Sequence, residues 1–195
     1  MRGVMFTGSS ISTLSRGSKS LVFLFLFLVG GAFSAEITYP DIQRELLEMA
    51  EIDRAARTGE LLVWDLEEVD RPNTQRLKEI VGEIGWPTIS LVGENGSVAA
   101  WLLAQHADRD PEFQKEALLL MGKHIDSGEV RSSDYAYLFD RVHQPQRFGT
   151  QGSCKGWYWE PREIESPEKL DSRRESFGLG PFSAYKRKMD ELCSE

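Results

Sequence analysis

The sequence has few of the residues that build common metal and nucleophile sites. Its 195 residues include two cysteines and three histidines. No C-x-x-C or H-E-x-x-H spacing occurs, which argues against a zinc site, and neither a P-loop nor a G-x-S-x-G elbow is present. We therefore expect no bound metal and no cofactor. None of the sequence motifs indicates a particular reaction.

Basic residues are also fewer than acidic residues. The chain has 23 lysines and arginines against 31 aspartates and glutamates, for a formal net charge of −8. Three of the basic residues and none of the acidic ones lie in the first 35 residues, so the remainder carries a net charge of −11. Such a chain repels nucleic acid and anionic membranes, and we expect neither as a partner.

A single long apolar run is present, at residues 21–29. Three basic residues precede this run and small residues follow it, which is the order of a secretory signal. The run is shorter than the roughly 20 residues that span a bilayer. We predict that residues 1–35 are a signal peptide and that the protein is exported, to the periplasm or the extracellular space, without stable membrane insertion after cleavage. An uncleaved anchor is the alternative.

The remaining residues, 36–195, suit a single domain, and helical periodicity dominates them. The predicted fold class is mainly α: an antiparallel helical domain with a small C-terminal β-hairpin formed by extended segments near 148–151 and 156–161. Residues 60–72 are predicted to form an irregular connection, and residues 88–92 a short strand or turn. The expected helices run from Ile42 to Gly59, from Asn73 to Gly85, from the Gly93–Ser97 cluster to His106, from Asp110 to Gly128, from Ser132 or Ser133 to Val142, and from Ser183 to Leu192.

His106 is the main candidate for proton transfer. It ends an apolar helical face, where a histidine is shielded from water and a carboxylate can orient it as a general base. Asp108 or Asp140 is the candidate orienting acid. The structural alternative is a core histidine bonded to a backbone carbonyl, with Asp108 as a loop residue.

Asp140 lies on a largely apolar helix, so its carboxylate needs a partner. One interpretation is a salt bridge to Arg54, Arg173 or Arg174. The other is a shared site in which Asp140 faces His106.

Candidate ligand-binding residues follow from the same region. Arg141 and Arg174 carry guanidinium groups that suit an anionic ligand, and Gln151 belongs to a glycine-containing turn that a ligand can approach closely. Surface ion pairs are the alternative role of the arginines. Cys154 and Cys193 can form a disulfide in an oxidising compartment, or remain two free thiols.

Several separated motifs in one order resemble the bacterial domain-of-unknown-function family numbered 6624. They cover nearly all of the chain after the leader, and the resemblance implies no activity. The motifs are Gln105-His106-Ala107-Asp108, Tyr137-Leu138 with Asp140-Arg141-Val142, Gly149-Thr150-Gln151, and Arg173-Arg174 with Gly178-Leu179.

Two functions fit these residues. The first is an exported metal-independent hydrolase acting on a small anionic or peptide ligand, with His106 as its base. The second is a non-catalytic envelope module that binds a ligand or another protein. Convergence of the candidate residues on one cleft favours the first function, and their dispersal favours the second.

Overall fold

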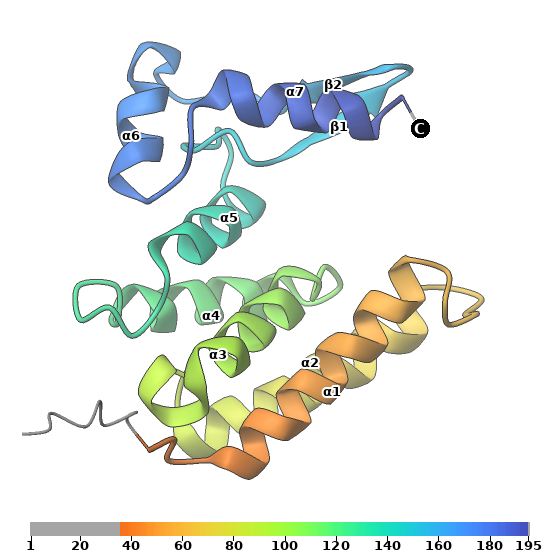
Figure 1. The fold of residues 1–195 in the computed structure, drawn as a ribbon, viewed down its shortest axis with the longest axis vertical. Helices are drawn as coiled ribbons and strands as arrows, with labels where there is room; N and C mark the ends of the chain where they lie inside the picture. The colour runs from red at the N-terminus through yellow and green to blue at the C-terminus, as the bar shows by residue number, and fades with distance from the viewer. Residues whose placement is uncertain (1–35, 195) are drawn as a thin grey trace, which may run out of the picture. The chain divides into compact units, whose positions relative to one another are not determined.

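The computed structural model describes residues 36–194, which form seven α-helices and one β-hairpin (Figure 1). The predicted signal peptide lies outside these residues. None of the described helices has the length and apolarity that a membrane crossing requires. The elements are α1 (Pro40–Arg57), α2 (Glu67–Ile84), α3 (Ile89–Gln105), α4 (Pro111–Gly122), α5 (Ser132–Val142), β1 (Gly152–Lys155), β2 (Tyr158–Pro161), a 3-10 turn (Pro167–Lys169), α6 (Leu170–Ser176) and α7 (Phe182–Leu192).

Helix α3 lies at the centre of the domain and packs against α1, α2, α4 and α5. Short connections reverse the chain between successive helices, so α1 and α2, and likewise α3 and α4, are antiparallel neighbours (Figure 1). The core contains fully buried Leu46, Leu77 and Leu138 around the small side chains of α3. The predicted mainly α fold is therefore confirmed.

The C-terminal part is a smaller layer in which α7 packs on β2 (Figure 1). The antiparallel hairpin pairs Cys154 of β1 with Trp159 of β2. The predicted hairpin is confirmed, although β1 begins after the segment 148–151 that was expected to be extended. The short helix α6 was not predicted, because Leu170 is its only buried apolar residue.

Two helix starts differ from the prediction. Helix α2 begins at Glu67 instead of Asn73, because Asp65 accepts a hydrogen bond from the Glu67 amide and the acidic first turn suits a helix N-terminus. Residues 88–92 form neither a strand nor a separate turn, since α3 already begins at Ile89 and is kinked at Gly93. The kink needs glycine: φ is 71° there, and a Cβ atom would lie 2.7 Å from Gln43 Nε2.

The predicted disulfide is present between Cys154 and Cys193, whose Cα atoms are 5.5 Å apart. It joins β1 to the end of α7, a helix with no buried residue. Besides the disulfide, Asp190 ties this helix to β2 by accepting from the Trp159 amide at 2.8 Å, and Tyr185 donates to the Thr150 carbonyl at 2.9 Å. The covalent bond therefore holds much of the C-terminal layer together.

We predict that replacing Cys154 and Cys193 with serine lowers the free energy of unfolding by up to about 4 kcal/mol, the chain-entropy value for a loop of this length. Because α7 has little burial of its own, its amides should lose hydrogen-exchange protection more than those of α3. Denaturant unfolding and hydrogen exchange monitored by mass spectrometry measure both effects. Equal loss of protection in α3 and α7 would contradict the proposed local role of the bond.

Candidate functional site

His106 is held by a carboxylate that the sequence analysis did not select. Both oxygens of Asp53 lie 3.0 Å from His106 Nδ1, and the Asp53 side chain is only 2% exposed. Arg57, one turn later on α1, donates from Nε to the same oxygens at 3.1 and 3.2 Å. The end of α1 is thereby joined to the residue that ends α3.

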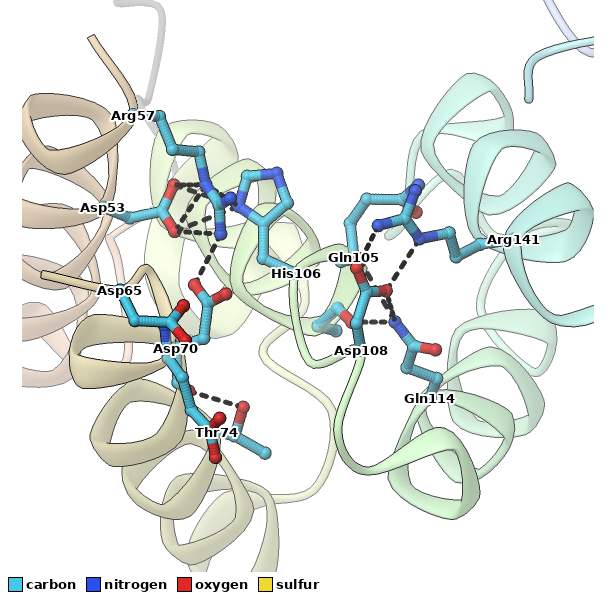
Figure 2. A network of polar contacts seen from close by, with 12 residues as sticks. Asp53, Arg57, Asp65, Asp70, Thr74, Gln105, His106, Asp108, Gln114 and Arg141 are labelled. Carbon is cyan, nitrogen blue, oxygen red and sulfur yellow. Dashed lines mark hydrogen bonds and ion pairs between the residues drawn. The ribbon is translucent and has the colours of Figure 1, made fainter. Parts of the chain in front are cut away.

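This contact determines which nitrogen of the His106 ring is available. A lone pair on Nδ1 would face two carboxylate oxygens, so we assign the proton to Nδ1, which donates it to Asp53. Arg57 Nε also lies 3.0 Å from Nδ1, but its hydrogen has the Asp53 oxygens as acceptors. In the neutral ring Nε2 then carries the lone pair, and Figure 2 shows Nε2 on the side of the ring away from Asp53. None of residues 36–194 forms a hydrogen bond with Nε2.

A second carboxylate completes the cluster. Arg57 Nη2 donates to Asp70 Oδ1 at 2.5 Å, so one guanidinium lies between the carboxylates of α1 and α2 (Figure 2). Burial raises the pKa of Asp53, but hydrogen bonds from His106 and Arg57 outweigh it and leave that pKa below its ordinary value. Burial dominates at Asp70, whose pKa is raised although Arg57 opposes the shift. Asp53 is therefore the firmly ionised member of the pair.

His106 borders a cavity of about 250 Å³ between α2 and the α3–α4 connection. The charged residues that line it belong to α2 and to the α3–α4 connection: Glu67, Asp70, Arg71, Lys78, Arg109 and Asp110. Three ion pairs engage most of these charges: Arg57 with Asp70, Lys78 with Asp110, and Arg109 with Glu67. Arg71 also lines the cavity, is exposed, and forms no ion pair with any of residues 36–194. Among residues 36–194, the cavity lining thus contains one cation without an ion pair, Arg71, and a histidine whose Nε2 has no hydrogen-bond partner.

Asp108 belongs to a different network, on the other side of the α3–α4 connection (Figure 2). Its carboxylate accepts from Arg141 Nε at 2.8 Å and also from Arg141 Nη2. Gln114 donates to the same carboxylate at 3.3 Å, and Arg141 Nη1 donates to Gln151 Oε1 at 3.0 Å. The structure thus brings together the predicted residues Asp108, Arg141 and Gln151, and these contacts link α4 and α5 to the segment before the hairpin.

Asp140 does not face His106, and the expectation that it orients the imidazole is wrong. Its carboxylate is fully buried and accepts hydrogen bonds from the backbone amides of Arg147, Phe148 and Thr150 at 2.7 to 3.0 Å, and from the Thr150 hydroxyl at 3.0 Å. Fixed amide dipoles therefore compensate the buried charge.

The expected salt bridges of Asp140 are absent among residues 36–194. Arg54 pairs with Glu51 and Glu60. Arg173 donates to backbone carbonyls, and Arg174, only 2% exposed, donates to the carbonyls of Phe148 and Gly180. Burial lowers the pKa of Arg174. The guanidinium of Arg174 is engaged within the fold, so the geometry gives no support to its predicted ligand role.

The residues that sequence reasoning missed are Asp53, Arg57 and Asp70. Asp53 had a detectable signal, because it continues the buried stripe of α1 through Leu46 and Met49 at helical spacing. A stripe that follows apolar residues alone continues from Met49 to Ile52, which is 49% exposed. A carboxylate at a core position of a helix indicates a buried partner, and that partner is His106. Within residues 36–194, no three acidic, histidine or cysteine side chains are grouped in a way that would hold a metal.

We predict that Asp53→Asn lowers the free energy of unfolding by roughly 2 to 3 kcal/mol at neutral pH, because it removes a buried charged acceptor. The folded-state pKa of Asp53 is lowered, so its contribution is complete above the unfolded-state pKa of about 3.9 and disappears as the pH falls through the folded-state value. The difference between parent and variant should therefore close in acid. Denaturant unfolding at several pH values measures it, with exposed Asp126→Asn as the control. A difference that is constant down to acid pH would contradict the assignment.

Comparison with known proteins identifies the family of this chain but assigns it no activity. A family profile described as a family of unknown function, DUF6624, matches residues 40–194. No curated protein and no solved structure matched the chain. The match spans α1 to the end of α7 and includes both polar networks. The chain belongs to the DUF6624 family.

Proposed function

We propose that this protein is an exported, metal-independent hydrolase in which His106 acts as the general base. The observation that carries the proposal is the Asp53–His106 contact beside a charged cavity. Asp53 holds the proton on Nδ1, so Nε2 is the nitrogen that accepts a proton from a water molecule attacking the bound ligand. The same carboxylate stabilises the imidazolium that forms, as an orienting acid does in catalytic triads.

The cavity favours a small ligand with an anionic group. Its volume of about 250 Å³ lies below the roughly 300 to 1,000 Å³ of drug-sized sites, so it fits a small molecule or one side chain of a peptide. Arg71 is the residue we assign to the anionic group, since Arg141 is already engaged by Asp108 and Gln151. This replaces Arg141 and Arg174 of the sequence-based hypothesis.

A non-catalytic binding module is the second candidate, and one observation favours it. Of the six predicted site residues, only His106 lines the cavity, while Asp108, Asp140 and Arg174 are engaged in contacts that hold the fold. Such dispersal is expected of a binding domain, in which His106 would be a hydrogen-bonding group of the site.

His106→Gln distinguishes these functions. We expect its free energy of unfolding to stay within about 1 kcal/mol of the parent, because Arg57 still satisfies Asp53. If His106 is the base, turnover of a responsive ester, amide, phosphate ester or glycoside should fall by about 10²-fold or more, and EDTA should have no effect on the parent.

The matched control is His143→Gln, because His143 is remote from the cavity lining and bonds only to the Phe139 carbonyl among residues 36–194. Full turnover in His106→Gln would exclude the general base. If the parent hydrolyses none of the four classes, the hydrolase proposal fails. A destabilisation of roughly 1 to 3 kcal/mol would indicate a structural tie.

Export is proposed from the leader sequence and has its own test. Residues 1–35 combine basic residues, a short apolar run and a small-residue exit, which directs a chain across the membrane and is then removed. We expect the N-terminus of the exported protein to fall within residues 33–36. Mass spectrometry of the cell envelope and the medium checks this, and a chain that retains residues 2–30 would contradict cleavage.

A further inference from the structure

The exposed large apolar side chains are concentrated in the N-terminal part of the described residues. Of the eleven large apolar side chains exposed among residues 36–194, seven lie between Tyr39 and Leu66, in α1 and the loop that follows it. Leu62 is 92% exposed and Trp64 98% exposed, and Leu47 on α1 is 40% exposed. Large apolar side chains that are exposed in one stretch of a chain suggest a surface that binds a partner.

The outer face of α1 has a charge order that complements itself. Helical spacing places Arg44, Leu47, Glu48 and Glu51 opposite the buried stripe of Leu46, Met49 and Asp53. Along this face the signs run negative at Asp41, positive at Arg44, negative at Glu48 and Glu51, and positive at Arg54. When the face is turned through a two-fold axis near Leu47 and Glu48, Asp41 meets Arg54 and Arg44 meets Glu51, and these four ion pairs flank the two Glu48 carboxylates near the axis.

We propose that this face binds a second copy of the chain, with the two α1 helices packed antiparallel about Leu47. A two-fold interface requires a self-complementary surface, and the charge order of α1 provides one. The charges are free to change partners, because the Asp41–Arg44, Glu51–Arg54 and Arg54–Glu60 pairs within one copy are largely exposed to water.

The antiparallel arrangement also covers the exposed loop. The loop follows the C-terminal end of α1, so it comes to lie beside the N-terminal end of α1 in the second copy. Tyr39, which is 38% exposed, is the N-cap residue immediately before α1 at that end. Leu62 and Trp64 then supply the apolar contact that ion pairs alone do not provide. Acidic residues flank the loop at Glu60 and Asp65, which disfavours an anionic lipid surface as the occupant.

Charge reversal tests the pairing directly. Arg44→Glu and Glu51→Arg each place like charges together, and every substitution occurs twice in a two-fold interface, so each should raise the dimer Kd by about tenfold or more. The combined variant restores opposite charges and should return the Kd to near the parent value. Sedimentation velocity over a concentration series gives these constants, with exposed Arg187→Glu on α7 as the charge-matched control.

Two further variants test the apolar centre. Leu47→Asp should give a monomer, whereas Leu119→Asp, at a leucine 71% exposed on α4, should leave the dimer intact. Leu47→Cys should cross-link to its counterpart under mild oxidation, because the axis passes beside it and the two native cysteines are already paired.

Several results would overturn the proposal. These are a parent protein that is monomeric at every concentration, a dimer insensitive to these variants, or a combined variant as weak as the single ones. Binding of the monomer to phosphatidylcholine vesicles that is lost in Trp64→Ser would assign the surface to lipid instead.

Discussion

The C-terminal half of the domain depends on the ionised carboxylate of Asp140. This carboxylate accepts hydrogen bonds from the backbone amides of Arg147, Phe148 and Thr150 and holds their segment against the end of α5. The segment so fixed presents the Phe148 carbonyl to Arg174 and the Thr150 carbonyl to Tyr185. Asp140 thus acts together with the disulfide and the Asp190–Trp159 contact to position α6 and α7. Since a buried charge costs several kcal/mol without partners, this segment has little freedom to adopt another conformation.

Asp53 is also a buried carboxylate, but its hydrogen-bond partners are side chains, whereas those of Asp140 are mainly backbone amides. The donors to Asp140 are backbone amides and a hydroxyl, which keep their protons at any physiological pH, so that cluster is purely structural. Asp53 instead binds an imidazole and a guanidinium, and the far nitrogen of that imidazole has no hydrogen-bond partner among residues 36–194. This difference, more than burial itself, underlies the proposed roles of His106 as the base and of Asp53 as the carboxylate that orients it.

The sequence predicted features that a recognisable residue pattern marks, and it failed where the partner is a distant backbone group or a distant side chain without such a pattern. Asp110 before Pro111 predicted a helix start, and its side chain does accept from the Phe113 amide at 3.1 Å. The paired cysteines of an expected exported chain predicted the disulfide. The partners of Asp140 could not be predicted, because backbone amides have no signature in the residue types that carry them. His106 was selected as a polar group on an apolar face, but its acid was sought nearby in sequence or on α5, whereas Asp53 lies 53 residues earlier.

The two faces of α1 separate the proposed chemistry from the proposed assembly. One face directs Asp53 into the domain toward His106, and the opposite face presents Arg44, Leu47 and Glu51 to solvent. Because side chains on opposite faces of a helix do not touch, changes at the outer face leave the Asp53 contacts in place. The ends of α1 are less independent, since the loop that carries Trp64 connects Arg57 to the start of α2, where Asp70 lines the cavity. If a second copy immobilises this loop, it also fixes the two helix ends that hold the Arg57–Asp70 pair. Assembly would then reduce the motion of the cavity wall without supplying any residue to the site.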